Sequence, residues 1–369
     1  MGLIALVGLA VLAGSQPIVA TLTRPLVTNP EPMSQLLAVR ELADGRVLAI
    51  DFKEKTVHLL DQTLTSTATL GREGKGPGEF SMPLGLVPMP GDVTYLVDPL
   101  SQRVLPIQPD GSFGAPIAFS TLGLGFVMAA PIADERGRLF FQAMSADVRA
   151  LTADSVPILR LDPGGKKTDT LAFYRPQKLE MSTEGGKVRM GAMKMFAPEE
   201  AWTATADGRV VRAIPEPYQL VIYANGKPTA GPPVEHSPIK VTEEEKAEAR
   251  TAWEQGMAAG RAAAAQAGGR GAGQFTAAEP QFATVKGPFA GRTALLPAPN
   301  GEVWVQRSRP FADKGGLYDR FDVKGRRIGQ VKLNPKSRVI GFGKGAVYVV
   351  RLDEDELQYL ERYRFPTAP

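Results

Sequence analysis

The chain has 369 residues, of which 43% are hydrophobic and 22% charged, so it is long enough and apolar enough to bury a sizeable core. The absence of cysteine excludes disulfides, thiolate metal sites, cysteine nucleophiles and a bacterial lipoprotein anchor. The net charge of +4 is spread along the chain without a basic run that carries interleaved aromatic residues, which excludes a typical nucleic-acid binder.

The first residues form an apolar stretch. Residues 2–13 read GLIALVGLAVLA, and small residues follow as far as Ala20, although no Lys or Arg precedes the run. Such a run is short for a bilayer span but has the length of a signal-peptide core. We therefore expect residues 1–20 to be a signal peptide or an N-terminal apolar segment. Export to the periplasm or out of the cell follows, with no stable membrane span after cleavage. A buried first strand or helix is the alternative.

A turn of the form x-Gly-x-hydrophobic, followed at once by a strand-like run, recurs six times. β-Branched and aromatic residues fill each run, which is too short for a helix. The turn glycines are Gly45, Gly91, Gly137, Gly208, Gly301 and Gly345. Three of the five intervals between them match the roughly 40–50 residues of a four-stranded propeller blade, and the other two need insertions.

Further strand-like runs follow these copies. A third run follows each of them, and a fourth, outer run follows the first five, for example at 65–70 and 327–333. The sixth copy ends at Phe365 without an outer strand, and a strand from the other end of the chain can complete such a ring. The candidate is VATLTRPLV at 19–27. The sequence therefore predicts an all-β, six-bladed β-propeller over residues 19–365, with a β-sandwich or two small β-domains as the alternative.

One blade carries a more specific motif. The stretch 70–113 begins LGREGKGPGEF, continues with Pro83, a strand and Asp98, and closes with Asp110-Gly111. It resembles the NHL-type repeat of bacterial six-bladed propellers, in which GxxGxGPGEF leads into the innermost strand of a blade. The resemblance implies the fold, with an extracytoplasmic location common among such proteins, and it implies no reaction. The loop lacks the ending of a phosphate-binding P-loop, so we interpret it as a structural turn.

The two long intervals place extra sequence on one face of the ring. The insertions lie at about 175–195, which is polar and rich in methionine, and at about 240–286. The second is predicted to be helical and of low complexity, between blades 4 and 5, and its glycine-rich segment 268–274 is typical of a flexible linker. It is expected to act as a lid or a partner-binding helix, or else to be a solvated excursion.

The helix of the second insertion has a recognisable start. Thr242 is a candidate cap, the three glutamates 243–245 occupy the first turn, where the helix dipole favours anions, and Glu245 is expected to complete a capping box. A weakly apolar face is expected from four residues at roughly helical spacing: Ala247, Trp253, Met257 and Ala264.

No catalytic set and no metal cluster is recognisable. Only two histidines exist, His58 in a strand-like run and His236 in a proline-rich loop, and no GxSxG, HExxH or EF-hand spacing occurs. We therefore predict no catalytic residues, no metal site and no cofactor.

The second strand of several copies ends in a charged or amide side chain at nearly the same place. Equivalent blade positions surround the same mouth of the ring, so acids from early blades are expected to face arginines from late blades. The two cations of the glycine-rich loop lie on the same face. Such a ring can bind an anionic or peptide ligand through charge-assisted hydrogen bonds, and salt bridges between adjacent blades are the alternative. The candidate ligand-binding residues are Arg72, Lys75, Asp51, Asp98, Gln142, Arg307 and Arg351.

These features favour a non-catalytic, exported binding or scaffolding propeller that acts as a monomer, with a protein, peptide or small anionic ligand at the channel mouth. The alternative resembles calcium-dependent six-bladed lactonases and phosphotriesterases, whose Ca²⁺ is held by carboxylate and amide oxygens. Asp51, Asp98 and Gln142 are the residues that would supply those oxygens, whereas Arg307 and Arg351 near the same mouth argue against a cation.

Overall fold

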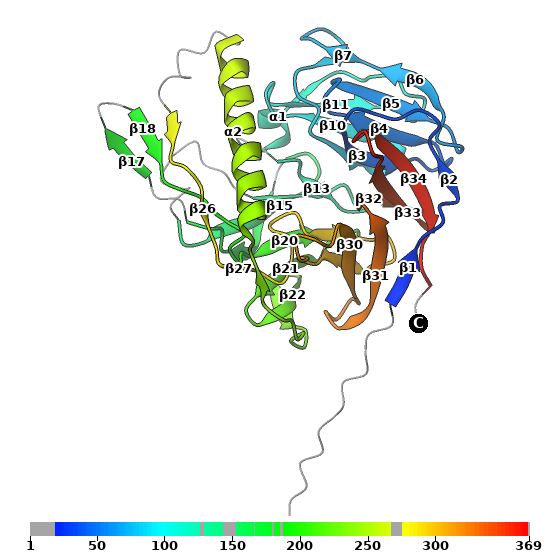
Figure 1. Ribbon diagram of the computed structural model, residues 1–369. Coiled ribbons are helices and arrows are strands. Elements are labelled where there is room, and N and C mark those ends of the chain that lie inside the picture. The colour runs from blue at the N-terminus through cyan, green and yellow to red at the C-terminus, as the bar shows by residue number, and fades with distance from the viewer. Residues whose placement is uncertain are drawn as a thin grey trace, which may run out of the picture.

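The computed structural model describes residues 19–125, 129–142, 153–165, 167–178, 181–184, 187–266 and 275–367 (Figure 1). Six sheets of four or five strands are arranged around a centre, and the expected all-β, six-bladed propeller is confirmed. All but the last two residues of the expected signal segment 1–20 lie outside the described residues.

Blades 1 to 5 each contribute an inner, a second, a third and an outer strand in chain order, and blade 6 contributes the first three of these. Blade 1 contains β3 (Leu36–Glu41), β4 (Val47–Asp51), β5 (Thr56–Leu60) and β6 (Ser66–Leu70), and blade 2 contains β9 (Gly85–Pro88), β10 (Thr94–Asp98), β11 (Arg103–Ile107) and β12 (Ile117–Ala118). Blade 3 contains β13 (Ile132–Ala133), β14 (Leu139–Gln142), β15 (Val156–Leu161) and β16 (Thr168–Tyr174), and blade 4 contains β20 (Ala201–Ala204), β21 (Val210–Pro215), β22 (Tyr218–Ala224) and β23 (Lys227–Ala230). Blade 5 contains β28 (Leu295–Pro297), β29 (Val303–Gln306), β30 (Gly315–Phe321) and β31 (Arg327–Pro335), and blade 6 contains β32 (Ser337–Gly343), β33 (Ala346–Leu352) and β34 (Gln358–Arg364).

Smaller elements lie between these strands. The glycine-rich loop after blade 1 forms β7 (Arg72–Glu73) and β8 (Glu79–Phe80), a 3₁₀ turn covers Pro90–Asp92, and the short helix α1 covers Phe119–Leu122.

The turn from the inner to the second strand contains a glycine in every blade. All six predicted turn glycines have a positive φ, between 66° and 87°, which a glycine adopts without steric cost. Gly208 is also closely packed, because a Cβ there would lie 2.3 Å from a guanidinium nitrogen of Arg138. The recurring turn that identified the repeat is therefore confirmed in each blade.

Two N-terminal strands complete the last two blades. β2 (Val27–Thr28) pairs antiparallel with β34 as the outer strand of blade 6, so the N-terminal part of the chain completes this blade, but of the predicted segment 19–27 only Val27 belongs to this strand. β1 (Val19–Leu22) instead pairs parallel with β31 and adds a fifth strand to blade 5. Asn29, directly after β2, holds this strand against β34. Its side-chain Oδ1 accepts a hydrogen bond from the main-chain N–H of Leu360 at 2.8 Å, and its main-chain N–H donates to the Leu360 carbonyl at 2.9 Å.

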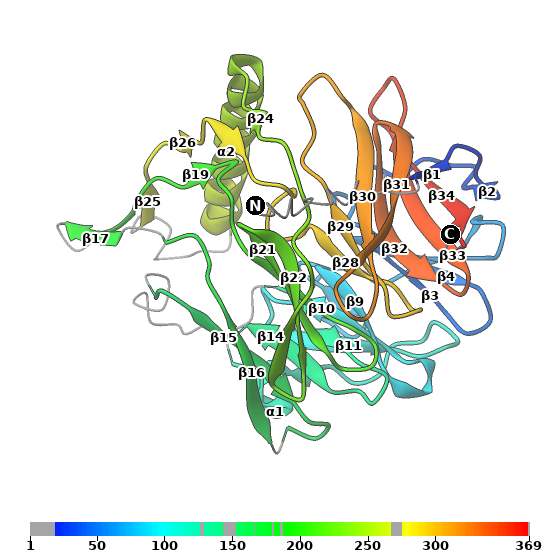
Figure 2. The same ribbon diagram turned by 90° about the horizontal axis from the view of Figure 1, so that it is seen from below.

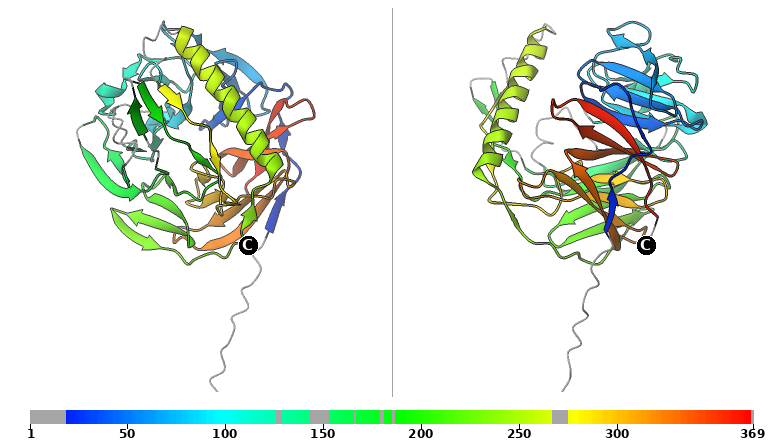
Figure 3. Two further views of the ribbon diagram at one scale, coloured as in Figure 1. Left: turned by 60° about the vertical axis from the view of Figure 1, so that its left-hand side comes forward. Right: turned by 45° about the vertical axis from the view of Figure 1, so that its right-hand side comes forward.

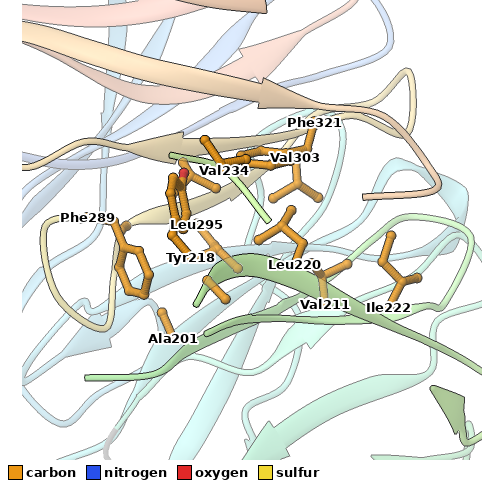
Figure 4. Packing of buried hydrophobic residues seen from close by; sticks show 13 residues of the cluster. Ala201, Val211, Tyr218, Leu220, Ile222, Val234, Phe289, Leu295, Val303 and Phe321 are labelled. Atoms are coloured by element: carbon orange, nitrogen blue, oxygen red, sulfur yellow. The ribbon is translucent and has the colours of Figure 1, made fainter. Parts of the chain in front are cut away.

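The core is divided among the blade interfaces. Six clusters of buried apolar side chains occur, and each lies between two neighbouring blades. The cluster between blades 4 and 5 is centred on Tyr218, Leu220 and Phe321, with Phe289 at its edge (Figure 4). Successive blades are therefore held together by layers of apolar packing, whose burial is the main favourable contribution to folding.

The two insertions fold together on one face of the ring. The first provides β17 (Met181–Glu184), β18 (Lys187–Met190) and β19 (Lys194–Met195). The second provides β24 (Ile239–Lys240), α2 (Glu243–Gln266), β25 (Phe275–Ala277), β26 (Gln281–Phe282) and β27 (Val285–Lys286). β18 pairs parallel with β25, and β19 pairs parallel with β26, so each insertion completes the other. We call these elements, with Phe196 that directly follows β19, the cap; Figures 2 and 3 show it gathered beside the ring.

The helix α2 begins where the sequence predicts. The main-chain N–H of Glu245 donates to the Thr242 hydroxyl at 3.2 Å, which confirms Thr242 as the residue that caps the helix N-terminus. The predicted capping box is wrong, since the Glu245 carboxylate pairs with Lys286 of β27 instead. The inward face also differs: Ala249, Trp253 and Met257 follow Glu245 at intervals of four and are partly buried, whereas Ala247 is exposed.

Candidate functional site

The carboxylates of the two predicted acids accept hydrogen bonds from the loops that lead into their own blades. Asp51, at the end of β4, is 2% exposed, and its carboxylate accepts the amides of Ser34 and Gln35 at 2.7 and 3.1 Å. Asp98, at the end of β10, is fully buried and accepts the amides of residues 81–82, both at 3.0 Å. The carboxylates at equivalent strand ends of two blades thus accept hydrogen bonds from corresponding main-chain amides. Buried polar groups require such partners.

The two predicted arginines pair within their own blades. Arg307 donates from Nη1 to Asp319 Oδ2 at 2.8 Å, and Arg351 donates from Nε to Glu361 Oε1 at 2.7 Å. Asp319 and Glu361 lie on the third strand of the same blade. Neither arginine pairs with Asp51 or Asp98, and neither forms the bridge between blades that was the alternative, because the adjacent strand of its own blade offers a carboxylate.

The cations of the glycine-rich loop are exposed. Arg72 donates from Nε to Glu79 at 2.9 Å, and the same carboxylate accepts the Gly76 amide at 2.8 Å. The hydrogen bond from the Gly76 amide contributes most, and that from Arg72 second, to lowering the pKa of Glu79 below its usual range. Lys75 is exposed at the tip of the same loop. Glu79 therefore holds the loop in shape from within, which supports the interpretation as a structural turn.

The remaining polar residues of interest have structural neighbours. Gln142, the last residue of β14, hydrogen-bonds Tyr174, whose hydroxyl pKa is raised by burial. His58 lies between Thr56 and Ser66, and burial lowers its pKa while Asp51 opposes the shift. The ring of His236 contacts Tyr218 edge-on at 6.1 Å.

A cleft lies between the cap and the loop that joins β29 to β30 in blade 5. It consists of two adjoining cavities of about 340 and 300 Å³. The residues that line both cavities define what we call the cap cleft: Phe196, Glu245, Lys286, Arg309, Asp313 and Lys314. The second cavity also reaches Arg307, which is the one predicted site residue that lines the cleft.

Lys286 holds the base of the cap against blade 5. Its ammonium group pairs with Glu245 of α2 and donates to the main-chain oxygen of Arg309 at 2.7 Å. The Lys286 and Glu245 side chains are only 9% and 12% exposed. A buried ion pair with a further hydrogen bond therefore fixes the position of α2 relative to the propeller.

Cations and aromatic rings alternate along the cleft. Lys286 lies 5.7 Å from the ring centre of Phe196, and Lys314 lies 3.8 Å from that of Phe311. Arg309 pairs with Asp313, whereas Lys314 forms no ion pair among the described residues. An exposed lysine that lies on an aromatic face and is not engaged in an ion pair is available to an incoming ligand.

The residues proposed for calcium do not fit a calcium site. The Asp51 and Asp98 carboxylates accept main-chain amides in separate blades, and Gln142 is engaged with Tyr174. Within the described ranges, no three residues of His, Cys, Asp or Glu are grouped so as to hold a metal ion. No helix in these ranges has the length and apolar character that a membrane span requires.

Most of the cap cleft was missed by sequence reasoning. Its residues come from three distant segments, and only their meeting in space makes a site. The available signal was the run 307–316, RSRPFADKGG, in which basic and aromatic residues interrupt a blade hairpin.

The comparisons with known proteins support the fold. Neither the scan against protein families nor the search of curated proteins found a match. A solved structure from Bacteroides fragilis, of a protein thought to be exported, is 10% identical, with a TM-score of 0.51 over 94% of this chain and 99% of that one. A DUF4221 family member from Bacteroides vulgatus is 9% identical, with a TM-score of 0.50 over 91% of this chain and 93% of that one. A gluconolactonase from Xanthomonas campestris, also 9% identical over 89% of this chain and 88% of that one, reaches a TM-score of 0.44, at which no activity is carried over.

Proposed function

We propose that this protein is a non-catalytic, exported binding or scaffolding propeller whose ligand occupies the cap cleft. The observation that supports this most is the joint construction of the cleft. Two separate insertions pair with each other and place α2 opposite the β29–β30 loop, and a concave charged and aromatic surface results. Binding sites are commonly built in this way, from irregular segments held by a rigid scaffold.

Among the seven residues that the sequence suggested, the proposal retains Arg307, which lines the cleft. Asp51, Asp98 and Arg351 are engaged inside their blades, as Arg307 is with Asp319, but unlike Arg307 they do not line the cleft. We propose that the ligand is a peptide, a protein segment or a small anion, and that the protein acts as a monomer.

Binding is tested with a panel of citrate, inorganic phosphate and short capped peptides, by calorimetry and by hydrogen exchange. We expect at least one of them to protect the α2 base and the β29–β30 loop. Lys314→Glu is expected to change its affinity, because the substitution reverses a charge on the cleft wall. Lys324→Glu is the matched control, since Lys324 is also exposed but lies in the turn at the other end of β30.

Two outcomes would contradict the proposal. One is that no probe protects the cleft. The other is turnover of a lactone or a phosphotriester, with or without added Ca²⁺, that is lost when cleft residues are changed. Export is tested separately by sequencing the N-terminus of the mature protein, which we expect to begin between Ala13 and Thr21.

A further inference from the structure

The two cavities of the cap cleft differ in the charge of their walls. Three cations and three acids line the first cavity, of about 340 Å³, whereas four cations and two acids line the second, of about 300 Å³. The acids of the second cavity are Glu245 and Asp313, and its cations are Lys286, Arg307, Arg309 and Lys314. A concave wall with an excess of one charge concentrates ligands of the opposite charge. The second cavity is therefore the part of the cleft that favours an anion.

Arg307 is the cation that only the second cavity has, and its guanidinium is held in place. Nε donates to the Pro288 carbonyl and Nη1 donates to Asp319 Oδ2, both at 2.8 Å, and the group lies 5.1 Å from the ring centre of Tyr218. The side chain is only 12% exposed. Because these contacts already fix the guanidinium, little conformational freedom is lost when it binds a ligand.

One nitrogen of this guanidinium remains available. Nη2 of Arg307 donates to no acceptor in the described part of the chain. It is not one of the buried side-chain atoms that lack a partner, so solvent reaches it, and the residue lines the second cavity. A ligand in that cavity can therefore accept a hydrogen bond from Nη2 without any rearrangement of the contacts that hold Arg307.

Asp319 does not cancel the positive charge behind this wall. Its carboxylate is fully buried and also accepts the Tyr218 hydroxyl at 2.8 Å and the Gln330 amide at 2.7 Å. A second cation, Arg327, lies 3.7 Å from its other oxygen, Oδ1. One acid thus serves two arginines, and this buried network has a net positive charge.

We propose that the second cavity binds a small dianion, a dicarboxylate or a phosphate, which accepts hydrogen bonds from Arg307 Nη2 and from the ammonium group of Lys314. The excess of two cations in the lining matches the charge of such a ligand, and hydrogen bonds between charged groups are strong ones. Lys314 is exposed and forms no ion pair among the described residues. The inference rests on the proposed function, since it names the ligand class of the same site.

Arg351 of blade 6 is a matched control for Arg307. Each of the two lies at the end of the second strand of its blade, pairs with an acid on the third strand and contacts a tyrosine ring, which for Arg351 is that of Tyr359 at 4.9 Å. Arg351 lines neither cavity. Replacement of either arginine by lysine keeps a cation beside the buried acid, but Arg307→Lys removes Nη2 from the cleft.

The probes are succinate and inorganic phosphate, titrated calorimetrically into the full chain, with the neutral succinamide as the control probe. We expect one or both anions to bind and to protect residues 306–316 from hydrogen exchange, whereas succinamide does not bind. Arg307→Lys should weaken the binding about tenfold, the effect of losing one hydrogen bond between charged groups, while Arg351→Lys leaves it unchanged. Urea unfolding checks that both variants fold. If Arg307→Lys does not fold, Lys314→Gln at the exposed wall decides, with a similar loss expected.

The outcomes separate this inference from the proposed function. Anion binding that protects residues 306–316 and weakens in Arg307→Lys but not in Arg351→Lys supports the inference, and the anion that binds identifies the ligand as a carboxylate or a phosphate. Equal weakening in both variants, or equal binding of succinamide, overturns it. Protection of the cleft by the capped peptides alone overturns the inference but leaves the proposed function intact. Absence of any binding in the cleft overturns both.

Discussion

The ring and the cap are built from different contacts. In the ring, strands that are neighbours in sequence pair with one another, and an apolar cluster joins each blade to the next. In the cap, strands from two separate insertions pair in parallel, and none of the six apolar clusters includes a described residue of β17–β19, β24–β27 or α2. Its base is held instead by the pair between Lys286 and Glu245.

This difference separates stability from recognition. The energy that holds the ring together is spread over six interfaces, so the ring tolerates an elaborate insertion on one face. The cap depends on fewer, more polar contacts, and regions of that kind open at lower free energy than a packed core. Changes in the cap are therefore expected to alter binding while the ring stays folded.

The largest effect is expected from the buried ion pair of blade 5. Arg320 is 2% exposed and donates to both carboxylate oxygens of Glu302, at 2.8 and 2.7 Å. Arg320→Leu leaves Glu302 buried without its main partner and is expected to lower the free energy of unfolding by about 3–5 kcal/mol, measured in urea. Arg326→Leu, at an exposed pair, is the control and is expected to cost less than about 1 kcal/mol. Equal losses in the two variants would show that the ring does not depend on its buried contacts in the way described.

A smaller and local effect is expected at the base of the cap. Lys286→Met leaves the Glu245 carboxylate without its partner, so α2 is expected to open more often. Hydrogen exchange over residues 242–258 should quicken by about tenfold or more, which corresponds to the loss of one charged hydrogen bond, while the urea midpoint of the ring stays unchanged. Lys246→Met, which removes an exposed pair with Glu243 on the same helix, is the control. A lower urea midpoint for Lys286→Met would mean that cap and ring unfold as one unit.

The smallest effect is expected from His58 in blade 1. Burial lowers its pKa from 6.5 in the folded chain, so below that pH the unfolded chain takes up a proton that the folded chain resists. The stability linked to His58 is therefore complete above pH 6.5 and is lost as the pH falls through the lower, folded pKa. His58→Asn should flatten this part of the stability–pH curve, measured by urea unfolding. A curve unchanged in His58→Asn would show that other groups cause the slope.

The blades were predictable because each depends on a few neighbouring residues. A turn such as the one at Gly45 and the alternating strand after it are local patterns, and repetition made them unambiguous. The missing outer strand of blade 6 indicated that the N-terminal part of the chain completes it, but Val19–Leu22 of the predicted segment 19–27 pair with blade 5, and the pairing strand of blade 6 is Val27–Thr28.

The cap cleft was not predictable in the same way. Glu245 has the sequence context of a capping box, yet Lys286, from a strand beyond the whole helix, takes its carboxylate. Arg307 was predicted as a binding residue at the channel mouth and lines the cap cleft instead, and its partner Asp319 lies across a hairpin whose loop length hides the pairing. Contacts of this kind depend on where three segments meet in space, and sequence periodicity says nothing of that.

The closure of the ring also sets an order of events during synthesis. β1 and β2 are translated before any blade, but their partners β31 and β34 are among the last strands to leave the ribosome. Such pairings between distant positions form slowly, because the intervening chain must be ordered first. A chain that crosses a membrane with its N-terminus leading would carry both strands unpaired until its final blade arrives. The ring can therefore close only after the last blade has been synthesised.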